Sequence, residues 1–201
     1  MFGGSRLRAV FAVLAVGTAS LTLAGTAGAS SGGGGLLIEA QDACDPATFV
    51  DPDTGDSLCS RSDGSGRRVS FDKLLNRISE KGAHGAWRFT PDNAKVNAGE
   101  PVSVQMGRGG EFHTFTRVDA FGPGCIQILN DLVFGPGSAM PAVCGELVPV
   151  PDGSGALAPK PFVEDAVLPF ATPVAAAKLK PGVNMFQCMI HPWMHATVTV
   201  E

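Results

Sequence analysis

The sequence lacks the features that mark several protein classes. It has one apolar run, near the N-terminus, and no second long hydrophobic segment. Its 15 Lys and Arg are outnumbered by 19 Asp and Glu, which gives a net charge of −4. Nucleic-acid binding requires a basic stripe, and an acidic balance argues against it. We therefore expect neither a membrane span in the mature chain nor a nucleic-acid partner.

Residues 1–29 have the pattern of a secretory signal peptide. Arg6 and Arg8 precede an apolar run from Ala9 to about Ala24, and small residues follow up to an A-x-A site that ends at residue 29. A retained anchor is the alternative, but the run is shorter than the roughly 20 residues that span a bilayer. Removal of residues 1–29 takes away two arginines and no acids, leaving 172 residues with 13 basic and 19 acidic side chains, a net charge of −6. We expect a secreted or cell-envelope protein outside the cytoplasm, and this length suits one domain.

The five cysteines are an odd number, and one of them needs an explanation. In an exported chain an even set suggests disulfides. Pairing Cys44 with Cys59 and Cys125 with Cys144 closes two short loops and leaves Cys188 as a free thiol. If Cys188 is bridged instead, another cysteine is left unexplained. We expect the local pairing.

The hydrophobic pattern changes along the chain from helical to alternating. Ser70 precedes FDKLLNRISEK, whose apolar residues recur at helical spacing up to Gly82, and this predicts a helix. From Trp87 onward short alternating runs are separated by Gly and Pro turns. Such runs predict an all-β fold, an antiparallel β-sandwich. The alternation breaks at about residues 121–161, where we expect a long insertion that contains the second disulfide.

We therefore expect three parts in the chain. Residues 1–29 form the signal peptide. Residues 30–84 form an N-terminal extension with a Gly-rich lead-in, a disulfide loop and one helix. Residues 85–201 form the sandwich domain with the insertion.

The densest group of metal-binding residue types lies in FQCMIHPWMHATVTVE at the C-terminus. Two residues separate Cys188 from His191, and two more separate His191 from Met194. A free cysteine in an oxidising compartment is a liability unless it is buried or coordinated. Pro192 interrupts strand pairing, so we expect these residues on a loop between two strands. One cysteine and two histidines in a trigonal set, with a weak axial methionine, form a blue-copper site.

Such a site needs a second histidine, and the candidates are His84, His113 and His195. His113 begins an alternating strand that a sandwich can bring beside Cys188. His84 lies in a Gly-flanked linker. Adjacent strand residues face opposite ways, so if Met194 points into the site, His195 points out. Zinc, or a buried cluster without metal, is an alternative to copper for these residue types.

The segment CMIHPWM followed by TVTVE resembles the ligand loop of the cupredoxins, the type 1 blue copper proteins, with an amicyanin-like spacing and a plastocyanin-like character. The resemblance extends to WRFTPDNAKVNAGEPVSV, FHTFTRV and LKPGVNMFQC, and so covers roughly residues 85–120 and 162–201. It implies a Greek-key β-sandwich with one type 1 copper per chain. The implied ligands are His113, Cys188, His191 and, axially, Met194.

Two positions depart from the family pattern. Many cupredoxins place Asn directly after the first histidine and tie it to a Ser or Thr directly after the cysteine. Thr114 and Met189 stand at these positions here. The contact that steadies the ligand loop must therefore differ in this chain.

The resemblance implies an electron carrier and not an enzyme. Protein atoms fill every coordination position, whereas metal catalysis needs an open one. We expect copper to cycle between Cu(II) and Cu(I), with electrons passing through a solvent-facing edge of His191 to unidentified redox partner proteins. Trp193 either belongs to an apolar patch around that edge or plugs the loop. The alternatives are extracellular copper delivery or storage, and a mononuclear copper enzyme if Met194 is not a ligand.

Overall fold

The structure, a computed structural model, describes residues 35–52, 54–59, 68–167, 173–176 and 179–201. The predicted signal peptide, residues 1–29, lies outside the described residues. Within the described ranges no helix has the length and apolar character needed to cross a membrane.

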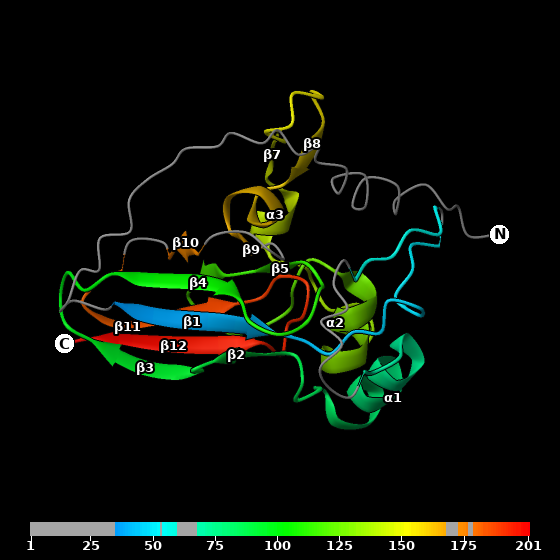
Figure 1. The fold of residues 1–201 in the computed structure, drawn as a ribbon, viewed down its shortest axis with the longest axis horizontal. Coiled ribbons are helices and arrows are strands. Elements are labelled where there is room, and N and C mark those ends of the chain that lie inside the picture. The colour runs from blue at the N-terminus through cyan, green and yellow to red at the C-terminus, as the bar shows by residue number, and fades with distance from the viewer. Residues whose placement is uncertain (1–34, 53, 60–67, 168–172, 177–178) are drawn as a thin grey trace, which may run out of the picture.

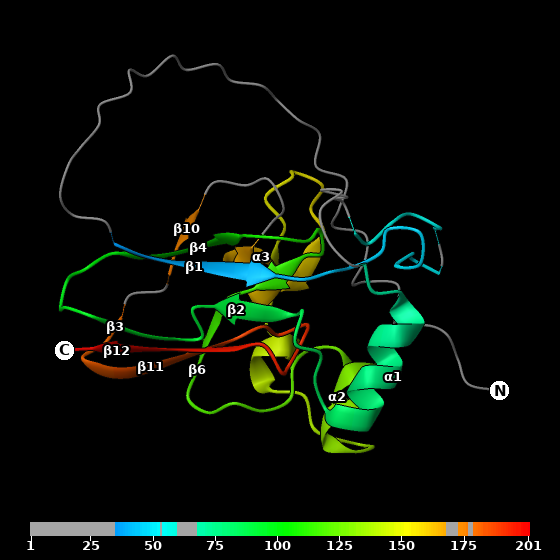
Figure 2. The ribbon, with the colours of Figure 1, turned by 60° about the horizontal axis from the view of Figure 1, so that its bottom comes forward.

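Two four-stranded sheets pack face to face as a sandwich (Figures 1 and 2). The first sheet has the order β10 (Val174–Ala175), β4 (Val102–Met106), β1 (Leu36–Gln41) and β2 (Arg88–Thr90). The second has the order β3 (Asn93–Val96), β12 (His195–Val200), β11 (Gly182–Gln187) and β6 (Thr116–Val118). Neighbouring strands are antiparallel except for one parallel pair in each sheet, β1 with β4 and β12 with β3. The predicted β-sandwich is confirmed, with mixed rather than purely antiparallel sheets.

Strand β1 comes from the segment that the sequence analysis assigned to the N-terminal extension. It lies inside its sheet, where Ile38 pairs in parallel with Val104 and Ala40 pairs antiparallel with Phe89. Ile38 and Ala40 are fully buried. The division of the chain at residues 84 and 85 stays a prediction, but the extension supplies an interior strand of the sandwich.

Alternating residues of both sheets form the core. Ile38 and Val104 on one sheet and Phe186 and Val198 on the other are almost completely buried. The ring of Phe115 stacks on Phe186 with centroids 4.2 Å apart. Burial of one such side chain stabilises the fold by about 1.5–3 kcal/mol. The core therefore fixes the end of β11, which is directly followed by the predicted ligand loop.

The predicted helix is confirmed as α1 (Phe71–Lys81). The side chain of Ser70 accepts a hydrogen bond from the Lys73 N–H and caps the N-terminus. Gly82 ends the helix in a left-handed conformation with φ of 68°, which favours glycine. Leu74 and Ile78 are the buried residues of the apolar face.

The insertion contains elements that the sequence analysis did not predict. They are α2 (Gln127–Phe134), the 3₁₀ helix η2 (Ala142–Gly145) and the hairpin of β7 (Leu147–Pro149) and β8 (Leu157–Pro159). The short helix α3 (Pro161–Glu164) begins where the insertion ends. In Figure 1, α1 and α2 lie together at one end of the sandwich, and the hairpin projects from one side of it. A further small sheet pairs β5 (His113–Thr114) with β9 (Ala166–Val167).

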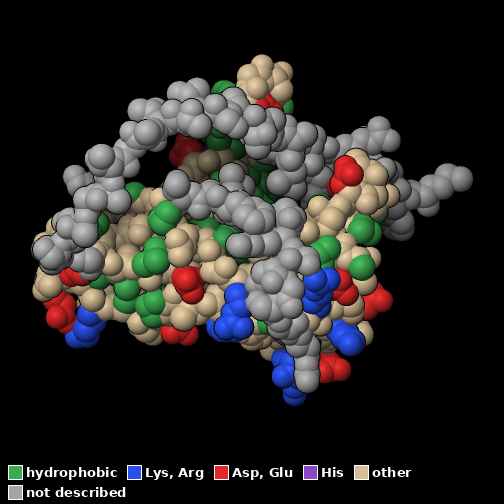
Figure 3. Space-filling model, viewed as in Figure 1, with side chains coloured by type: hydrophobic (Ala, Val, Ile, Leu, Met, Phe, Trp, Pro, Cys, Tyr) green, Lys and Arg blue, Asp and Glu red, His purple; other side chains and the backbone are tan. Residues whose placement is uncertain are grey.

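Four of the five cysteines form two disulfides between neighbours in the sequence. Cys44 is bonded to Cys59 and Cys125 to Cys144, and Cys188 is a buried free thiol. On the face of the molecule drawn in Figure 3, acidic and basic side chains are interspersed along the lower edge. That part of the surface carries no continuous basic stripe.

Candidate metal centre

The loop from β11 to β12 is closed by its own backbone. The N–H of Cys188 donates to the carbonyl of Met194 (3.0 Å), and the N–H of Met194 donates to the carbonyl of His191 (2.9 Å). Gln187 and His195, on either side of the loop, are paired partners of β11 and β12. The seven residues from Cys188 to Met194 therefore form a tight turn at the end of the sandwich where α1 and α2 lie (Figure 1).

Strand register brings His113 to this loop. In the pairing of β6 with β11, Thr116 lies opposite Gln187. Continuing that antiparallel register by two residues places Thr114 beside Met189. The structure contains this contact, because the N–H of Met189 donates to Oγ1 of Thr114 (2.8 Å). His113, directly before Thr114, is thereby held next to Cys188.

Three donor atoms converge on one buried point. Cys188 Sγ lies 3.8 Å from His113 Nδ1 and 3.7 Å from His191 Nδ1, and the two Nδ1 atoms are 3.2 Å apart. His113 and Cys188 have no solvent exposure, and His191 is 2% exposed. Among the described residues these three form a group whose ligand atoms all lie within 4.8 Å of one another.

The spacing of the three donors fits a metal ion. The point that is equidistant from the three donors in their own plane lies about 2.1 Å from each. This distance matches metal–nitrogen bonds of about 2.0–2.1 Å and is slightly shorter than metal–sulfur bonds of about 2.3 Å. One thiolate with two imidazoles is a donor set for copper or zinc. The residues present therefore fit a bound transition metal.

The surroundings of Cys188 favour the thiolate form of its side chain. The backbone N–H groups of Thr114 and His191 both donate to its Sγ at 3.5 Å. Burial alone raises the pKa of the Cys188 thiol, but hydrogen bonds and charge from His113 and His191 outweigh burial and hold it well below its ordinary value. The thiolate is the form that binds metals.

Each histidine contacts a carboxylate through the ring nitrogen that faces away from the cluster. His113 Nε2 lies 3.1 Å from Asp42 Oδ2, and neither side chain has solvent exposure. His191 Nε2 lies 3.6 Å from Glu111 Oε1, and the Glu111 side chain is 13% exposed. Both imidazoles therefore sit between the thiol and a carboxylate.

These contacts shift the pKa values of both rings upward. Burial lowers the pKa of His113, but hydrogen bonds to Asp42 and Cys188 outweigh it and raise the pKa to about 9. Burial likewise opposes the charged form of His191, and Glu111 and Cys188 together raise its pKa to about 10. The pKa of Asp42 is lowered, because its contacts with His113 and the backbone N–H groups of Cys44 and Glu111 outweigh its burial.

The predicted solvent-facing edge of His191 is wrong. The ring is 2% exposed. Glu111 covers its Nε2. The ring centroid of Trp87 lies 6.4 Å from that of His191, and the ring of Trp193 packs edge-on with its centroid at 5.4 Å. Two of these covering residues, Trp87 and Glu111, lie outside the ligand loop, so their approach could not be read from the loop sequence.

The other candidate ligands lie in different surroundings. His195 stacks on Phe121 with ring centroids 4.0 Å apart, and its Nε2 hydrogen-bonds the carbonyl of Pro192 (2.7 Å). His84 packs edge-on against Trp87. Neither belongs to the group of His113, Cys188 and His191. Met194 is fully buried in the core, and its role as an axial ligand stays a prediction.

The insertion covers the ligand loop from outside. The N–H of Cys125 donates to the carbonyl of Met189, and the side chain of Gln187 bonds both backbone groups of Gly122. Buried Asn130 of α2 in turn bonds both the N–H and the carbonyl of Gly124. The loop is thus held between the sandwich and the start of the insertion.

The sequence analysis missed Asp42 and Glu111. Glu111 stands two residues before His113, and an acid beside a candidate ligand is the signal that could have drawn attention to it. Asp42 directly follows β1 and is 71 residues from His113. Its position depends on the unpredicted placement of β1 in the sheet.

Comparison with known proteins gives structural similarity only. No protein-family model and no curated protein matches the chain. Among solved structures the chain is similar to a purple cupredoxin from Nitrosopumilus maritimus, with 16% identity over 59% of this chain and 87% of that one and a TM-score of 0.34. It is also similar to the oxidised form of plastocyanin from Dryopteris crassirhizoma, with 22% identity over 57% and 89% of the chains and a TM-score of 0.32. A mutant fern plastocyanin matches with the same values. We therefore base the function on the donor atoms of this chain.

Proposed function

We propose that the protein is an exported type 1 copper protein that carries single electrons and is not an enzyme. The observation that supports this most directly is the convergence of His113 Nδ1, Cys188 Sγ and His191 Nδ1 on one buried point. Two disulfides support a location outside the reducing cytoplasm. When bound, copper supplies the one-electron couple between Cu(II) and Cu(I).

The surroundings of the donors favour copper over zinc and electron transfer over catalysis. Fully buried Met194, at the end of the same loop, is the candidate for the weak axial thioether that such copper sites use. Catalytic metal sites keep a position open to water or substrate. The three donors here are buried and their loop is covered by the insertion.

The fold around the site keeps the three donor atoms in place in both oxidation states of the metal. The backbone bonds within the loop, the hydrogen bond from Met189 to Thr114 and the stacked core below Cys188 all restrict ligand movement. A site that does not rearrange on electron transfer has a small reorganisation cost.

Because His191 is buried, we propose that electrons reach the surface through a side chain that covers it. Trp193 is partly exposed, lies in the same loop and contacts the His191 ring edge-on at 5.4 Å. The predicted patch around an exposed edge of His191 does not apply, because that edge is covered, and we propose instead that Trp193 itself is the electron route to a partner protein.

The test is to load recombinant protein with Cu(II) and to record its visible spectrum and redox behaviour. An intense thiolate-to-copper band with reversible reduction and fast self-exchange is expected. Cys188→Ser and His113→Ala should abolish the band, whereas the matched control His195→Ala should keep it. Copper that is labile and exchanges readily with chelators supports delivery or storage instead, and a water-coordinated copper supports an enzyme.

A further inference from the structure

We infer that Asp42 and Glu111 are positioning residues of the metal centre, which act through Nε2 of His113 and His191 to favour oxidised copper over reduced copper. This inference rests on the proposed function. Each carboxylate faces the nitrogen opposite the one that faces Cys188. A carboxylate at Nε2 keeps the ring proton there, so that Nδ1 is the atom left for the metal.

Asp42 is held in place as a buried anion. Its carboxylate accepts hydrogen bonds from the backbone N–H groups of Cys44 (3.0 Å), Gly110 (3.1 Å) and Glu111 (3.0 Å), in addition to its contact with His113. All of these partners are donors. Such a carboxylate is stabilised in its charged form.

The backbone next to Asp42 is shaped to admit this carboxylate. Gly109 has a φ of 107°, and a Cβ built on it meets the Asp42 carboxylate at 2.2 Å. Only glycine fits both the backbone conformation and the space. The approach of Asp42 to the 109–111 segment is therefore built into the fold.

A hydrogen bond from Trp87 orients Glu111 toward His191. The indole N–H of Trp87 donates to Glu111 Oε2, while Oε1 faces His191 Nε2. Trp87 is buried and also stacks on Phe49 of the disulfide loop. The Glu111 carboxylate is thus held by Trp87 through one oxygen while the other oxygen faces His191.

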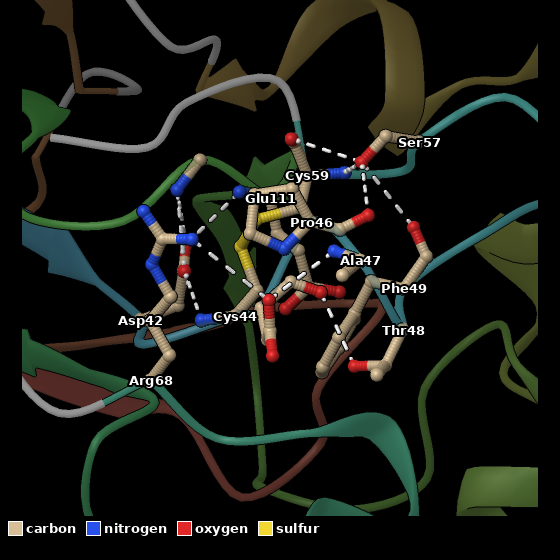
Figure 4. The surroundings of a disulfide bond; sticks show 12 residues. Asp42, Cys44, Pro46, Ala47, Thr48, Phe49, Ser57, Cys59, Arg68 and Glu111 are labelled. Carbon is tan, nitrogen blue, oxygen red and sulfur yellow. Dashed lines mark hydrogen bonds and ion pairs between the residues drawn. A yellow bond between two sulfur atoms is a disulfide. The ribbon is translucent and has the colours of Figure 1, made fainter. Parts of the chain in front are cut away.

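The disulfide of the N-terminal extension connects the backbone next to Asp42 with the backbone at Glu111. Cys44, two residues after Asp42, is bonded to Cys59, and Cys59 forms an antiparallel bridge with Glu111. Figure 4 shows Asp42 and Glu111 beside this disulfide. The extension therefore has a role at the metal centre: it supplies Asp42 and anchors Glu111.

A negative charge behind each ligand stabilises the oxidation state with the higher positive charge. The effect is larger for fully buried Asp42 than for partly exposed Glu111, because solvent screens a buried charge less. Loss of an outer-sphere partner of a ligand histidine typically weakens metal binding about 10- to 100-fold. We expect the weaker binding to affect Cu(II) and to be small for Cu(I).

The test compares Asp42→Asn and Glu111→Gln with Asp45→Asn in the copper-loaded full protein. Asp45 lies in the loop closed by this disulfide, forms an ion pair with Arg68 and accepts a hydrogen bond from the Ala47 N–H. It does not belong to the group of His113, Cys188 and His191. Asp42→Asn should weaken Cu(II) binding about 10-fold or more with little change for Cu(I), which corresponds to a rise in reduction potential of about 59 mV per tenfold. Glu111→Gln should give a smaller rise, and Asp45→Asn none.

A measurement on the unaltered chain keeps the inference testable if a variant does not fold. In zinc-loaded wild-type protein, nitrogen-15 NMR should show slowly exchanging Nε2 protons on both His113 and His191. The inference would be overturned if Asp42→Asn and Glu111→Gln had the same reduction potential as Asp45→Asn. It would also be overturned if the Nε2 protons exchanged freely. Absence of the thiolate-to-copper band in the wild type would instead overturn the proposed function, and the zinc measurement separates the two outcomes.

Discussion

The Nδ1 atoms of His113 and His191 face each other at 3.2 Å, and both rings carry a carboxylate on the opposite nitrogen. Without a metal this arrangement brings two basic nitrogens together beside a thiol. The pKa values of both rings are raised, to about 9 for His113 and about 10 for His191, so the metal-free rings hold protons more tightly than an ordinary imidazole does.

Copper uptake at pH 7 should therefore release protons from the imidazoles of His113 and His191. Apparent Cu(II) affinity should rise with pH until about pH 9–10, where both rings are neutral without metal. Proton release measured with an indicator dye in weak buffer tests this. Release of no protons at pH 7, or an affinity independent of pH between 7 and 9, contradicts it.

The same pKa values predict the pH dependence of the metal-free fold. A pKa raised above the unfolded value of about 6.5 stabilises the fold fully below pH 6.5, and this contribution is lost as pH rises through about 9 and 10. The melting temperature of metal-free protein should thus fall between pH 7 and pH 10. Copper-loaded protein should show a smaller fall, since its imidazoles are already deprotonated at Nδ1.

Thr114 should connect the two ligand segments through its hydroxyl. Thr114→Val leaves the buried N–H of Met189 without its acceptor, which costs about 1–3 kcal/mol. Thr114→Ser keeps the hydroxyl and is the matched control. Denaturant unfolding and the rate of copper loss to a chelator measure the effect. Equal values for the Val and Ser variants would show that the hydroxyl has no such role.

Gly124 should hold the insertion against the ligand loop by close backbone approach. A Cβ at this position meets the carbonyl oxygen of Met189 at 2.4 Å, whereas a Cβ at Gly122 meets nothing within 4 Å. Gly124→Ala should therefore destabilise the protein by about 1–3 kcal/mol and speed copper loss. Gly122→Ala is the control and should be close to neutral in both measurements. Similar effects of the two substitutions would contradict the covering role.

Trp193 should carry the electron between His191 and the surface. Trp193→Phe keeps an aromatic ring at the contact, whereas Trp193→Ala removes it. We expect self-exchange, followed by NMR line broadening of mixed oxidised and reduced protein, to slow by tenfold or more in the Ala variant and by less in the Phe variant. Unchanged self-exchange in Trp193→Ala would mean that electrons leave by another route.

The features that could be predicted from the sequence depend on local patterns. Alternation gave strands such as β4 and β12, and the cap residues Ser70 and Gly82 marked both ends of α1. Spacing within the loop singled out Cys188 and His191, which the structure brings together with His113. Strand alternation also predicted that His195 turns away from the site, and it stacks on Phe121.

The features that could not be predicted depend on contacts between distant segments. Strand β1 follows a Gly-rich run and offers only two buried alternating residues, so nothing in its sequence indicated an interior position. The Asp42 contact with His113 follows from that placement. The burial of His191 depends instead on contacts with Trp87 and Glu111, which lie outside the loop. Helix α2 was missed because its N-cap, Ile126, has no side-chain capping bond and the flanking residues are glycine and proline turns.

The visible and EPR spectrum of the Cu(II)-loaded protein, recorded beside Cys188→Ser, tests the proposed type 1 site most directly. We expect an intense thiolate-to-copper band and the small parallel copper hyperfine splitting of a covalent thiolate site, both lost in Cys188→Ser. A pale protein with ordinary copper hyperfine splitting, unchanged in Cys188→Ser, would contradict a copper centre formed by His113, Cys188 and His191.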